Sequence, residues 1–328
     1  MSGTGASAAP PPKARVLVLG DLMLDVVLAA SRPVESGTDV PGRVEIRQGG
    51  SAANTARWLG RLGVATQLVC SIGRDGAGRS LVTQLERDGV TVHARRIAGS
   101  RTGRIGVLVA PGGERSFVAD RRAADLLAPE DLREEWFERV DLVHLPIYSL
   151  LGEPLGRAGR RAVTFARAAG ALVSLDLASI VPMLSAGRRA ARELVAGIHA
   201  DVLFATEAEA QALLGRYAPD GLLEFAEVVV IKLGARGARV VARHPATAAA
   251  DPDTEPVPPI AFDVATPAVL AKDTTGAGDA FDAGFIAGWL AARAAGRALA
   301  DALHRATLAG HRAAARHLGG PRLELPAG

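Results

Sequence analysis

The stretch ARVLVLGD (14–21) decides the fold, because it is a continuous apolar run that ends in Gly-Asp. A run without polar alternation is typical of a strand that is buried on both faces of a sheet. Similar short runs recur at 66–72, 141–145, 171–176, 201–205 and 227–233. Helical stretches lie between most of them, at 51–62, 75–87, 152–169 and 185–198. This alternation predicts a mostly parallel sheet covered by helices on both faces, joined by right-handed crossovers.

Two segments interrupt this alternation early in the chain. Residues 32–48 are polar and alternate around the turn-forming pair Pro41-Gly42. Residues 102–120 are typical of a hairpin, with RIGVLVA and RSFVAD as strands and PGGE as the turn. We expect the two segments to pair as a small sheet that stands over one edge of the main domain.

The composition is that of an ordinary globular protein with one large core. Of the 328 residues, 48% are hydrophobic and 22% are charged. The first 13 residues lack a basic start and an apolar stretch, so we expect a disordered tail and no signal peptide. No run of about 18 apolar residues occurs, so no membrane span is expected. Cys70 is the single cysteine, which excludes an internal disulfide and favours the cytoplasm.

The charge pattern argues against a nucleic-acid partner. The net charge is only +3, and aromatic residues make up 4% of the chain. The arginines are scattered through Ala-rich helices beside acidic residues, and no dense basic block with interleaved aromatics occurs. The sequence therefore predicts solvated helix faces at these positions.

The most informative stretch for function is DTTGAGDAFDAGFIAGWL (273–290), a glycine-rich turn followed by an apolar helix. Gly276, Ala277 and Gly278 leave backbone N–H groups at the helix start, which with the helix dipole make an anion site. Asp279 falls in the first helical turn, where it could accept a proton from a hydroxyl that attacks a bound phosphate. The local sequence is equally compatible with an Asp that complements the helix dipole and glycines that only pack closely.

A second group of candidate residues lies nearer the N-terminus. Gly49 and Gly50 allow a ligand to approach the backbone, and Asn54 follows in the first turn of a helix, with donors and an acceptor that suit a polyol. Asp21 and Asp25 follow the first strand at its carboxyl end, where ligands of open α/β sheets bind. The alternatives are a simple strand-to-helix turn around Asn54, and capping or solvation for the two carboxylates.

Competing phosphate-binding motifs are absent. No Gly-Lys pair occurs, which excludes a Walker-A loop. The first strand ends in GDLMLD, which is not a dinucleotide fingerprint, and GAGDAF lacks the third glycine of one. The motif set of protein kinases is missing as well.

Taken together, these motifs resemble those of the ribokinase-like (PfkB) family of carbohydrate and nucleoside kinases. GGSAANTARWLGRLGVATQLVCSIGRDGAG (49–78) is similar to the N-terminal signature of that family, and DTTGAGDAF (273–281) to its C-terminal one. The similarity extends over about residues 14–322. It implies a ribokinase-like three-layer αβα sandwich with a mostly parallel central sheet. It also implies a small β-sheet lid, with lid segments at about 32–48 and 92–120, which covers the sugar and in some members forms a homodimer interface.

The resemblance implies roles for individual residues. Asp279 matches the family's catalytic base, and the anion hole matches Gly276, Ala277 and Gly278. The family's sugar-binding positions correspond to Asp25, Gly49, Gly50 and Asn54.

Further matches concern ATP and metal ions. The turn KLGARG (232–237) matches an adenine-nucleotide loop. The residues implied to lie at the nucleotide are Thr206, Lys232, Gly234, Gly237, Thr275 and Gly278. Glu209 would contact Mg²⁺ through water, and Asp273 and Thr275 match positions near a site for a monovalent cation such as K⁺.

Three departures from the family pattern bear on the substrate. Thr206 stands where an Asn-x-x-Glu motif begins, and Thr206 with Glu209 also forms a capping-box sequence. Met23 stands where ribokinases proper carry a sugar-binding Asn. The segment PIYS (146–149) lacks the Glu that ribokinases use there. The kinase class survives these departures, but ribose as the acceptor does not follow.

The sequence therefore predicts ATP-dependent phosphorylation of a hydroxyl on a small sugar or sugar-like molecule. A nucleoside kinase is the alternative within the fold, although few aromatics other than Phe117 lie near the expected lid. A phosphosugar kinase is a further alternative, whose second phosphate could meet Arg101, Arg104, Arg115, Arg121 and Arg122. A non-catalytic sugar- or nucleotide-binding regulator is the alternative from another class, and it would be expected to lose Asp279 or the glycines.

Overall fold

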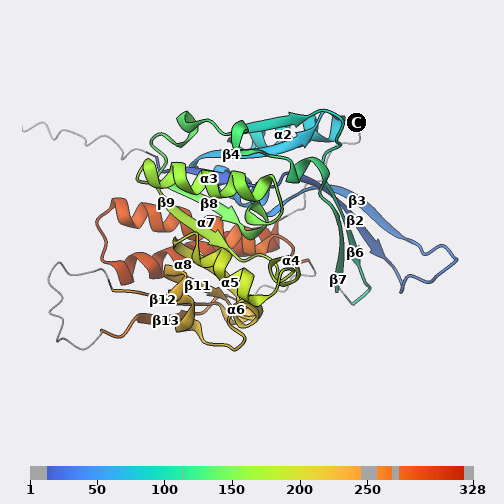
Figure 1. Ribbon diagram of the computed structural model, residues 1–328. Helices are drawn as coiled ribbons and strands as arrows, with labels where there is room; N and C mark the ends of the chain where they lie inside the picture. Colours follow the sequence, from blue (N-terminus) through green and yellow to red (C-terminus); the bar gives the residue numbers. More distant parts are fainter. Residues whose placement is uncertain (1–12, 113, 245–256, 268–272, 321–328) are drawn as a thin grey trace, which may run out of the picture.

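A nine-stranded sheet forms the centre of the protein (Figure 1). The computed structural model describes residues 13–112, 114–244, 257–267 and 273–320. The strand order is β13-β12-β11-β10-β9-β8-β1-β4-β5, and every neighbouring pair from β11 to β5 is parallel. The two strands beyond β11 are antiparallel to their neighbours. The bounds are β1 Arg15–Leu19, β4 Ala65–Gly73, β5 Val90–Ile97, β8 Leu142–Pro146, β9 Leu172–Asp176, β10 Ala200–Thr206, β11 Ala226–Lys232, β12 Ala238–Ala242 and β13 Ile260–Val264.

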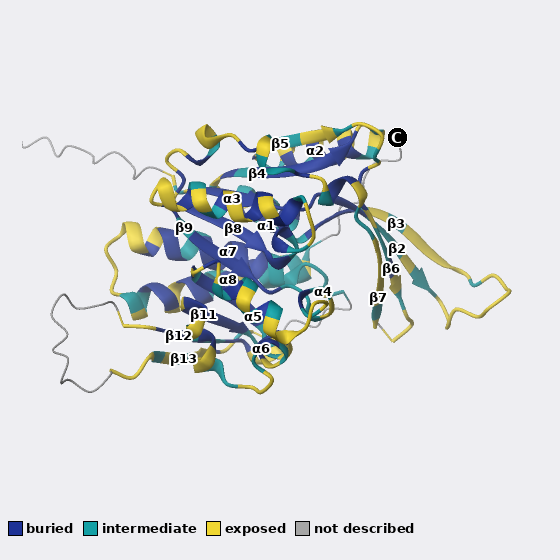
Figure 2. Ribbon diagram, in the orientation of Figure 1, coloured by how far each residue is buried: buried dark blue, intermediate teal, exposed yellow. Residues whose placement is uncertain are grey.

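Helices cover both faces of this sheet, as the sequence predicts. One face packs against α1 Ser51–Arg61, α2 Gly76–Arg87, α7 Ala277–Ala294 and α8 Leu299–Gly319. The other packs against α3 Leu155–Ala168, α5 Arg188–Ala196 and α6 Glu207–Leu214, near the short α4 Ile180–Met183. The position of β1 between the two helix layers explains its continuous apolar run. Val16 and Val18 face the layer that contains α1 and α7, whereas Leu17 and Leu19 face the layer that contains α3 and α5. Figure 2 shows this buried centre in dark blue.

A four-stranded lid sheet stands away from the main sheet on the right of Figure 1. Its order is β3-β2-β6-β7, from β2 Met23–Ala30, β3 Gly42–Gly49, β6 Arg104–Val109 and β7 Arg115–Asp120. The β6–β7 hairpin predicted from 102–120 is confirmed. Strand β2 lies at the centre, antiparallel to β3 and parallel to β6.

The expected lid boundaries need correction. Residues 90–97 form β5, the edge strand of the main sheet, so the second lid segment does not begin at 92. The central lid strand β2, at 23–30, lies outside the segments expected from the sequence. Strand β5 escaped recognition because an edge strand is half exposed and lacks a continuous apolar run. The tail expected at 1–13 lies outside the described residues except for Lys13.

Among the residues described, none of the helices combines the length and the apolar character that crossing a membrane requires.

Candidate active site

The glycine-rich turn adopts a left-handed backbone immediately before α7. Gly276 has φ 78° and ψ 1° and caps the helix, which begins at Ala277. A side chain at Gly276 would also meet the imidazole of His317 at 3.2 Å. A Cβ on Gly278 would lie 3.4 Å from Nζ of Lys232, so this first turn passes close to a buried ammonium group. The left-handed backbone therefore favours glycine at position 276, and the nearby Lys232 ammonium group favours a small residue at position 278.

Asp279 lies in the first turn of α7 and is held by two donors from α1. The Ser51 hydroxyl donates to Oδ1 at 2.8 Å, and Nδ2 of Asn54 donates to Oδ2 at 2.9 Å. Burial raises the pKa of Asp279 to about 6, although these two hydrogen bonds favour the charged form. The carboxylate is therefore a base that titrates close to neutral pH, in a fixed orientation. Asn54, predicted to bind sugar, here orients Asp279.

Asp25 projects from the lid strand β2 against Gly49 of β3. A Cβ on Gly49 would lie 1.8 Å from Oδ1 of Asp25, so any side chain there would displace the carboxylate. Burial, with the nearby Asp21 and Asp279 carboxylates, raises the pKa of Asp25 to about 7. Its Oδ1 is buried and has no hydrogen-bond partner among the described residues. Asp25 lines the cavity beneath the lid, and its buried Oδ1 is an acceptor without a partner among the described residues.

Asp21 has a different environment from the one predicted. Its Oδ1 accepts from the backbone N–H of Ala52 at 3.1 Å, and Oδ2 accepts from Nη1 of Arg121 at 3.0 Å. Gly50, with φ 96°, packs so closely that a Cβ would lie 2.5 Å from the Asp21 carbonyl oxygen. The carboxylate is buried and holds the start of α1 to the segment that follows β7. Asp21 does not line the cavity, whereas Asp25 and Asn54 do.

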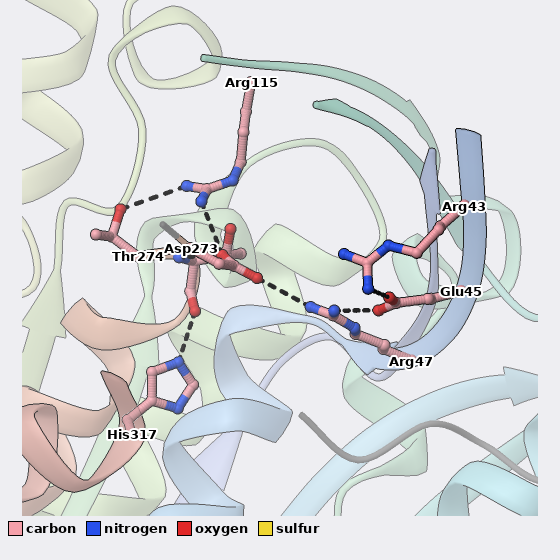
Figure 3. A network of polar contacts seen from close by, with 8 residues as sticks. Arg43, Glu45, Arg47, Arg115, Asp273, Thr274 and His317 are labelled. Carbon is pink, nitrogen blue, oxygen red and sulfur yellow. Dashed lines mark hydrogen bonds and ion pairs between the residues drawn. The ribbon is translucent and has the colours of Figure 1, made fainter. Parts of the chain in front are cut away.

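Asp273 joins the lid to the glycine-rich turn (Figure 3). Its Oδ2 accepts from Nη1 of Arg47 at 2.9 Å, and its Oδ1 lies 2.8 Å from Nη2 of Arg115. The backbone N–H of Thr275 also donates to Oδ1, at 3.0 Å. Two guanidinium groups on one carboxylate do not fit a monovalent cation at the same oxygens, because like charges would adjoin. The expected K⁺ site at Asp273 and Thr275 does not fit these residues.

His317, near the end of α8, fixes the same turn and was not predicted. Its Nε2 lies 2.6 Å from the carbonyl oxygen of Thr275, and its Nδ1 accepts from Nε1 of Trp58 at 3.2 Å. Because Nδ1 accepts from Trp58, Nε2 carries the proton and donates to the carbonyl oxygen of Thr275. No sequence signal pointed to this residue, since a lone His near the end of a polar helix is common.

Lys232 lies at the end of β11 between two carboxylates. Its Nζ donates to Oδ1 of Asp176 at 2.9 Å and to Oδ2 of Asp282 at 3.1 Å. Burial lowers the pKa of Lys232, but the two carboxylates outweigh it and raise the pKa above the ordinary value. Burial raises the pKa of Asp282, against the attraction of Lys232. Both partners were missed, although Asp176 ends the run ALVSLD and Asp282 follows Asp279 by one helical turn.

Thr206 and Glu209 form the capping box that their spacing allows. The Glu209 N–H donates to Thr206 Oγ1 at 3.3 Å, and the Thr206 N–H donates to Glu209 Oε2 at 2.8 Å. Burial and the Asp176 carboxylate raise the pKa of Glu209. Within the described ranges no cluster of three or more His, Cys, Asp or Glu could hold a metal ion. Any Mg²⁺ would therefore take most of its ligands from phosphates and water.

The turn that follows β11 keeps the expected glycines in positive-φ conformations. Gly234 has φ 61° and Gly237 has φ 101°. A Cβ on Gly237 would lie 2.1 Å from the carbonyl oxygen of Val264, so this glycine is required for packing against β13. No atom lies within 4 Å of the Cβ position at Gly234, which leaves that side of the turn open.

The cavity beneath the lid brings both halves of the chain together. Residues from the lid strands, from α1, from the glycine-rich turn and from α8 line it: Asp25, Val27, Arg47, Gln48, Asn54, Arg57, Val107, Val109, Arg115, Asp273, Thr275, Gly276 and His317. One wall therefore belongs to the lid, and the other to α1, the glycine-rich turn and α8.

Comparison with known proteins identifies the class that this fold and site define. The family described as pfkB family carbohydrate kinase matches residues 13–323. An ATP-dependent ribose-1-phosphate kinase of Halopiger xanaduensis is 35% identical over 288 residues, covering 87% of this chain and 88% of that protein. The chain belongs to the pfkB family of carbohydrate kinases.

Two other similar proteins act on different acceptors. Fructokinase-1 of Oryza sativa is 30% identical over 282 residues, covering 81% of this chain and 80% of that protein. The crystal structure of adenosine kinase from Sinorhizobium meliloti has a TM-score of 0.77 at 23% identity, covering 96% and 98% of the two chains. The ribokinase-like fold predicted from the sequence is thereby confirmed.

Proposed function

We propose that this protein transfers the γ-phosphoryl group of ATP to a hydroxyl of a small sugar-like molecule, with Asp279 as the general base. The observation that carries the proposal is the buried Asp279 carboxylate, whose pKa is raised to about 6 and which Ser51 and Asn54 orient beside the Gly276 turn. A general base is most effective when its pKa lies near the working pH.

The acceptor lies in the cavity between the lid and α7 in this mechanism. Its hydroxyl oxygen attacks the γ-phosphorus, so that a new O–P bond forms while the bond to the β-phosphate oxygen breaks and ADP leaves. The hydroxyl proton passes to Asp279. Backbone N–H groups at Gly278 and Asp279, at the start of α7, stabilise the charge on the moving phosphoryl group. Asp25 accepts a hydrogen bond from another acceptor hydroxyl.

ATP would lie across the turn at 234–237 and the start of α7. Lys232 and its two carboxylate partners fix the strand end beneath this surface, so Lys232 acts by position and not by direct phosphate contact. Mg²⁺ bound to the ATP phosphates would neutralise their charge, with Glu209 in reach through water. The cytoplasm is the compartment that we propose, since ATP is supplied there.

The acceptor class is the open part of this function. The similar proteins phosphorylate, by their names, a sugar phosphate, a sugar and a nucleoside. A nucleoside kinase would need an aromatic platform under the lid, but Phe117 is 58% exposed and does not line the cavity. A non-catalytic regulator would not need the oriented Asp279. A carbohydrate acceptor fits the site best.

The test is Asp279→Asn, assayed for ADP release against pentoses, hexoses, phosphorylated sugars, sugar acids and nucleosides. Loss of the base should lower kcat by about 10²–10⁴-fold while the acceptor still binds. Retention of most of kcat with the best acceptor would refute Asp279 as the base. The absence of phosphoryl transfer to any acceptor, by a protein that binds ATP, would instead favour the regulator.

We also propose a homodimer through the outer face of the lid. Strand register places Leu28, Val44 and Leu108 side by side on one face, and they are 37%, 67% and 38% exposed. Val118, 75% exposed, extends the same face across β7. Light scattering should give twice the chain mass for the wild type and the monomer mass for Val44→Glu. A monomeric wild type at micromolar concentration would contradict the proposal.

A further inference from the structure

Three arginines line the cavity in which the acceptor would lie. Arg47 enters from β3 and Arg115 from β7, and their side chains are only 19% and 14% exposed. Arg57 enters from α1 and is 11% exposed. Figure 3 shows Arg47 and Arg115 converging from the lid on Asp273. Burying a guanidinium group costs free energy, so three of them around one small cavity need compensating interactions with anionic groups.

The guanidinium groups of the cavity already have carboxylate partners. Arg47 pairs with Asp273 and Glu45, and Arg57 pairs with Asp88 at 2.9 Å. The Asp25 carboxylate lies among other acidic groups, and its pKa of about 7 means that it is partly protonated at neutral pH. An anionic group on the acceptor could replace one of these carboxylates as the partner of a guanidinium group, whereas a neutral polyol offers only uncharged hydrogen bonds.

Arg47 also has a donor beyond its present contacts. Arg47 bonds Asp273 through Nη1 and Glu45 through Nη2, while its buried Nε has no hydrogen-bond partner among the described residues. Two guanidinium groups that meet on a single carboxylate already have the convergent arrangement in which several anionic oxygens are bound. A phosphate group, with three terminal oxygens, could use more of these donors than the one carboxylate of Asp273.

We propose that the acceptor already carries a phosphate group, which Arg47 and Arg115 bind beneath the lid. This inference rests on the proposed kinase function. With the phosphate at the lid wall, a free hydroxyl at the other end of a small sugar would face Asp279, because Asn54 lines the same cavity and bonds that carboxylate. The reaction would convert a sugar monophosphate into a sugar bisphosphate, with ADP as the second product.

The lid arginines would also couple acceptor binding to the glycine-rich turn. Phosphate would draw Arg47 and Arg115 from Asp273, whose Oδ1 also accepts the N–H of Thr275 next to Gly276. The Arg–carboxylate contact would thus hold the lid wall in place before the acceptor binds, and phosphate would take over part of that contact.

The experiment compares matched acceptors that differ only in phosphate: ribose with ribose 1-phosphate and ribose 5-phosphate, and fructose with fructose 1-phosphate. A sugar acid of similar size tests a carboxylate in its place. We expect kcat/KM to be at least about 100-fold higher for one of the phosphorylated sugars than for its neutral form, since hydrogen bonds to charged groups are strong. A neutral sugar or the sugar acid as the best acceptor would overturn the inference but leave the kinase function intact.

Variants then assign the effect to the lid. Arg115→Gln and Arg47→Gln should each raise KM for the phosphorylated sugar about 10- to 100-fold, with a much smaller effect on its neutral form. Arg96→Gln is the control, because Arg96 is an exposed arginine of the edge strand β5 that does not line the cavity. Equal losses with both acceptors would mean that the arginines only hold the lid to Asp273, and would refute the phosphate subsite.

A binding measurement separates this inference from the proposed function. In Asp279→Asn, calorimetry should still detect the phosphorylated sugar, with a Kd that rises with salt and rises again when Arg115→Gln is added. If the phosphorylated sugar binds but the wild type transfers no phosphoryl group to it, the kinase function alone is refuted. A Kd that Arg115→Gln does not change would refute the phosphate subsite alone.

Discussion

Removing the Ser51 hydroxyl should move the acidic limb of the pH–rate profile. Ser51 donates a 2.8 Å hydrogen bond to Asp279, and this bond favours the charged carboxylate. Without the bond the pKa of Asp279 rises further above its present value of about 6. The base then becomes protonated at a higher pH, so activity near neutral pH falls. Ser51→Ala keeps a good helix residue at the start of α1, which limits the change to the hydroxyl.

The size of the shift follows from the bond that is lost. A hydrogen bond to a charged group contributes about 1.5–3 kcal/mol, and one pKa unit corresponds to about 1.4 kcal/mol. The bond from Asn54 to the other carboxylate oxygen remains, and water can replace part of the lost interaction. We therefore expect the apparent pKa of the acidic limb to rise by about one unit.

The assay is kcat/KM for the acceptor between pH 5 and 9, at saturating ATP and Mg²⁺. Thr55→Val is a matched control from the same helix, because the buried Thr55 hydroxyl has no hydrogen-bond partner among the described residues. Asp25→Asn identifies any limb that belongs to Asp25, whose pKa is about 7. An acidic limb that is unchanged in Ser51→Ala would show that Asp279 is not the titrating base.

Three further changes test other parts of the site. Replacing K⁺ by Na⁺ or tetramethylammonium should change the rate less than about twofold, since guanidinium groups occupy both oxygens of Asp273; strict K⁺ dependence would contradict this. Gly49→Ala should raise the acceptor KM at least about tenfold, because its Cβ would lie 1.8 Å from Asp25 Oδ1; normal acceptor kinetics would contradict the close packing. Lys232→Met should lower the free energy of unfolding in urea by about 3–5 kcal/mol, because it strands buried carboxylates, and adding Asp282→Asn should restore part of it. A decrease of less than about 1 kcal/mol in the free energy of unfolding would mean that water solvates the carboxylates of Asp176 and Asp282.

The sequence predicted the core of the fold because burial on both faces leaves a pattern. Strands β1, β4, β8, β9, β10 and β11 are continuous apolar runs and were all found. Strand β5, VTVHARRI, is an edge strand in which only Val90 is buried, so it lacks the continuous apolar run of the core strands. The short strands β12 and β13 are antiparallel to their neighbours, and the helix-strand alternation of a parallel sheet could not reveal them.

The site was predictable only where one local segment carries the chemistry. The left-handed Gly276 and the position of Asp279 follow from GAGD, and the capping box of Thr206 and Glu209 follows from TEAE. The partners of Lys232 and the Asp273 contacts with the lid depend on residues far apart in the chain. Sequence periodicity carries no information on such contacts, so the ion pair of Asp21 with Arg121 and the hydrogen bond of Asn54 to Asp279 could not be predicted.

The contact between His317 and Thr275 ties the order of synthesis to the appearance of activity. The residues that line the cavity begin at Asp25, whereas His317 is made much later in synthesis. The carbonyl group that His317 contacts belongs to Thr275, in the turn that precedes α7. A chain still being made on the ribosome can form the parallel strands and the lid long before residue 317 exists. Such an intermediate would lack the His317 contact with the glycine-rich turn. Under the proposed function, phosphoryl transfer should therefore appear only after α8 has been made and packed.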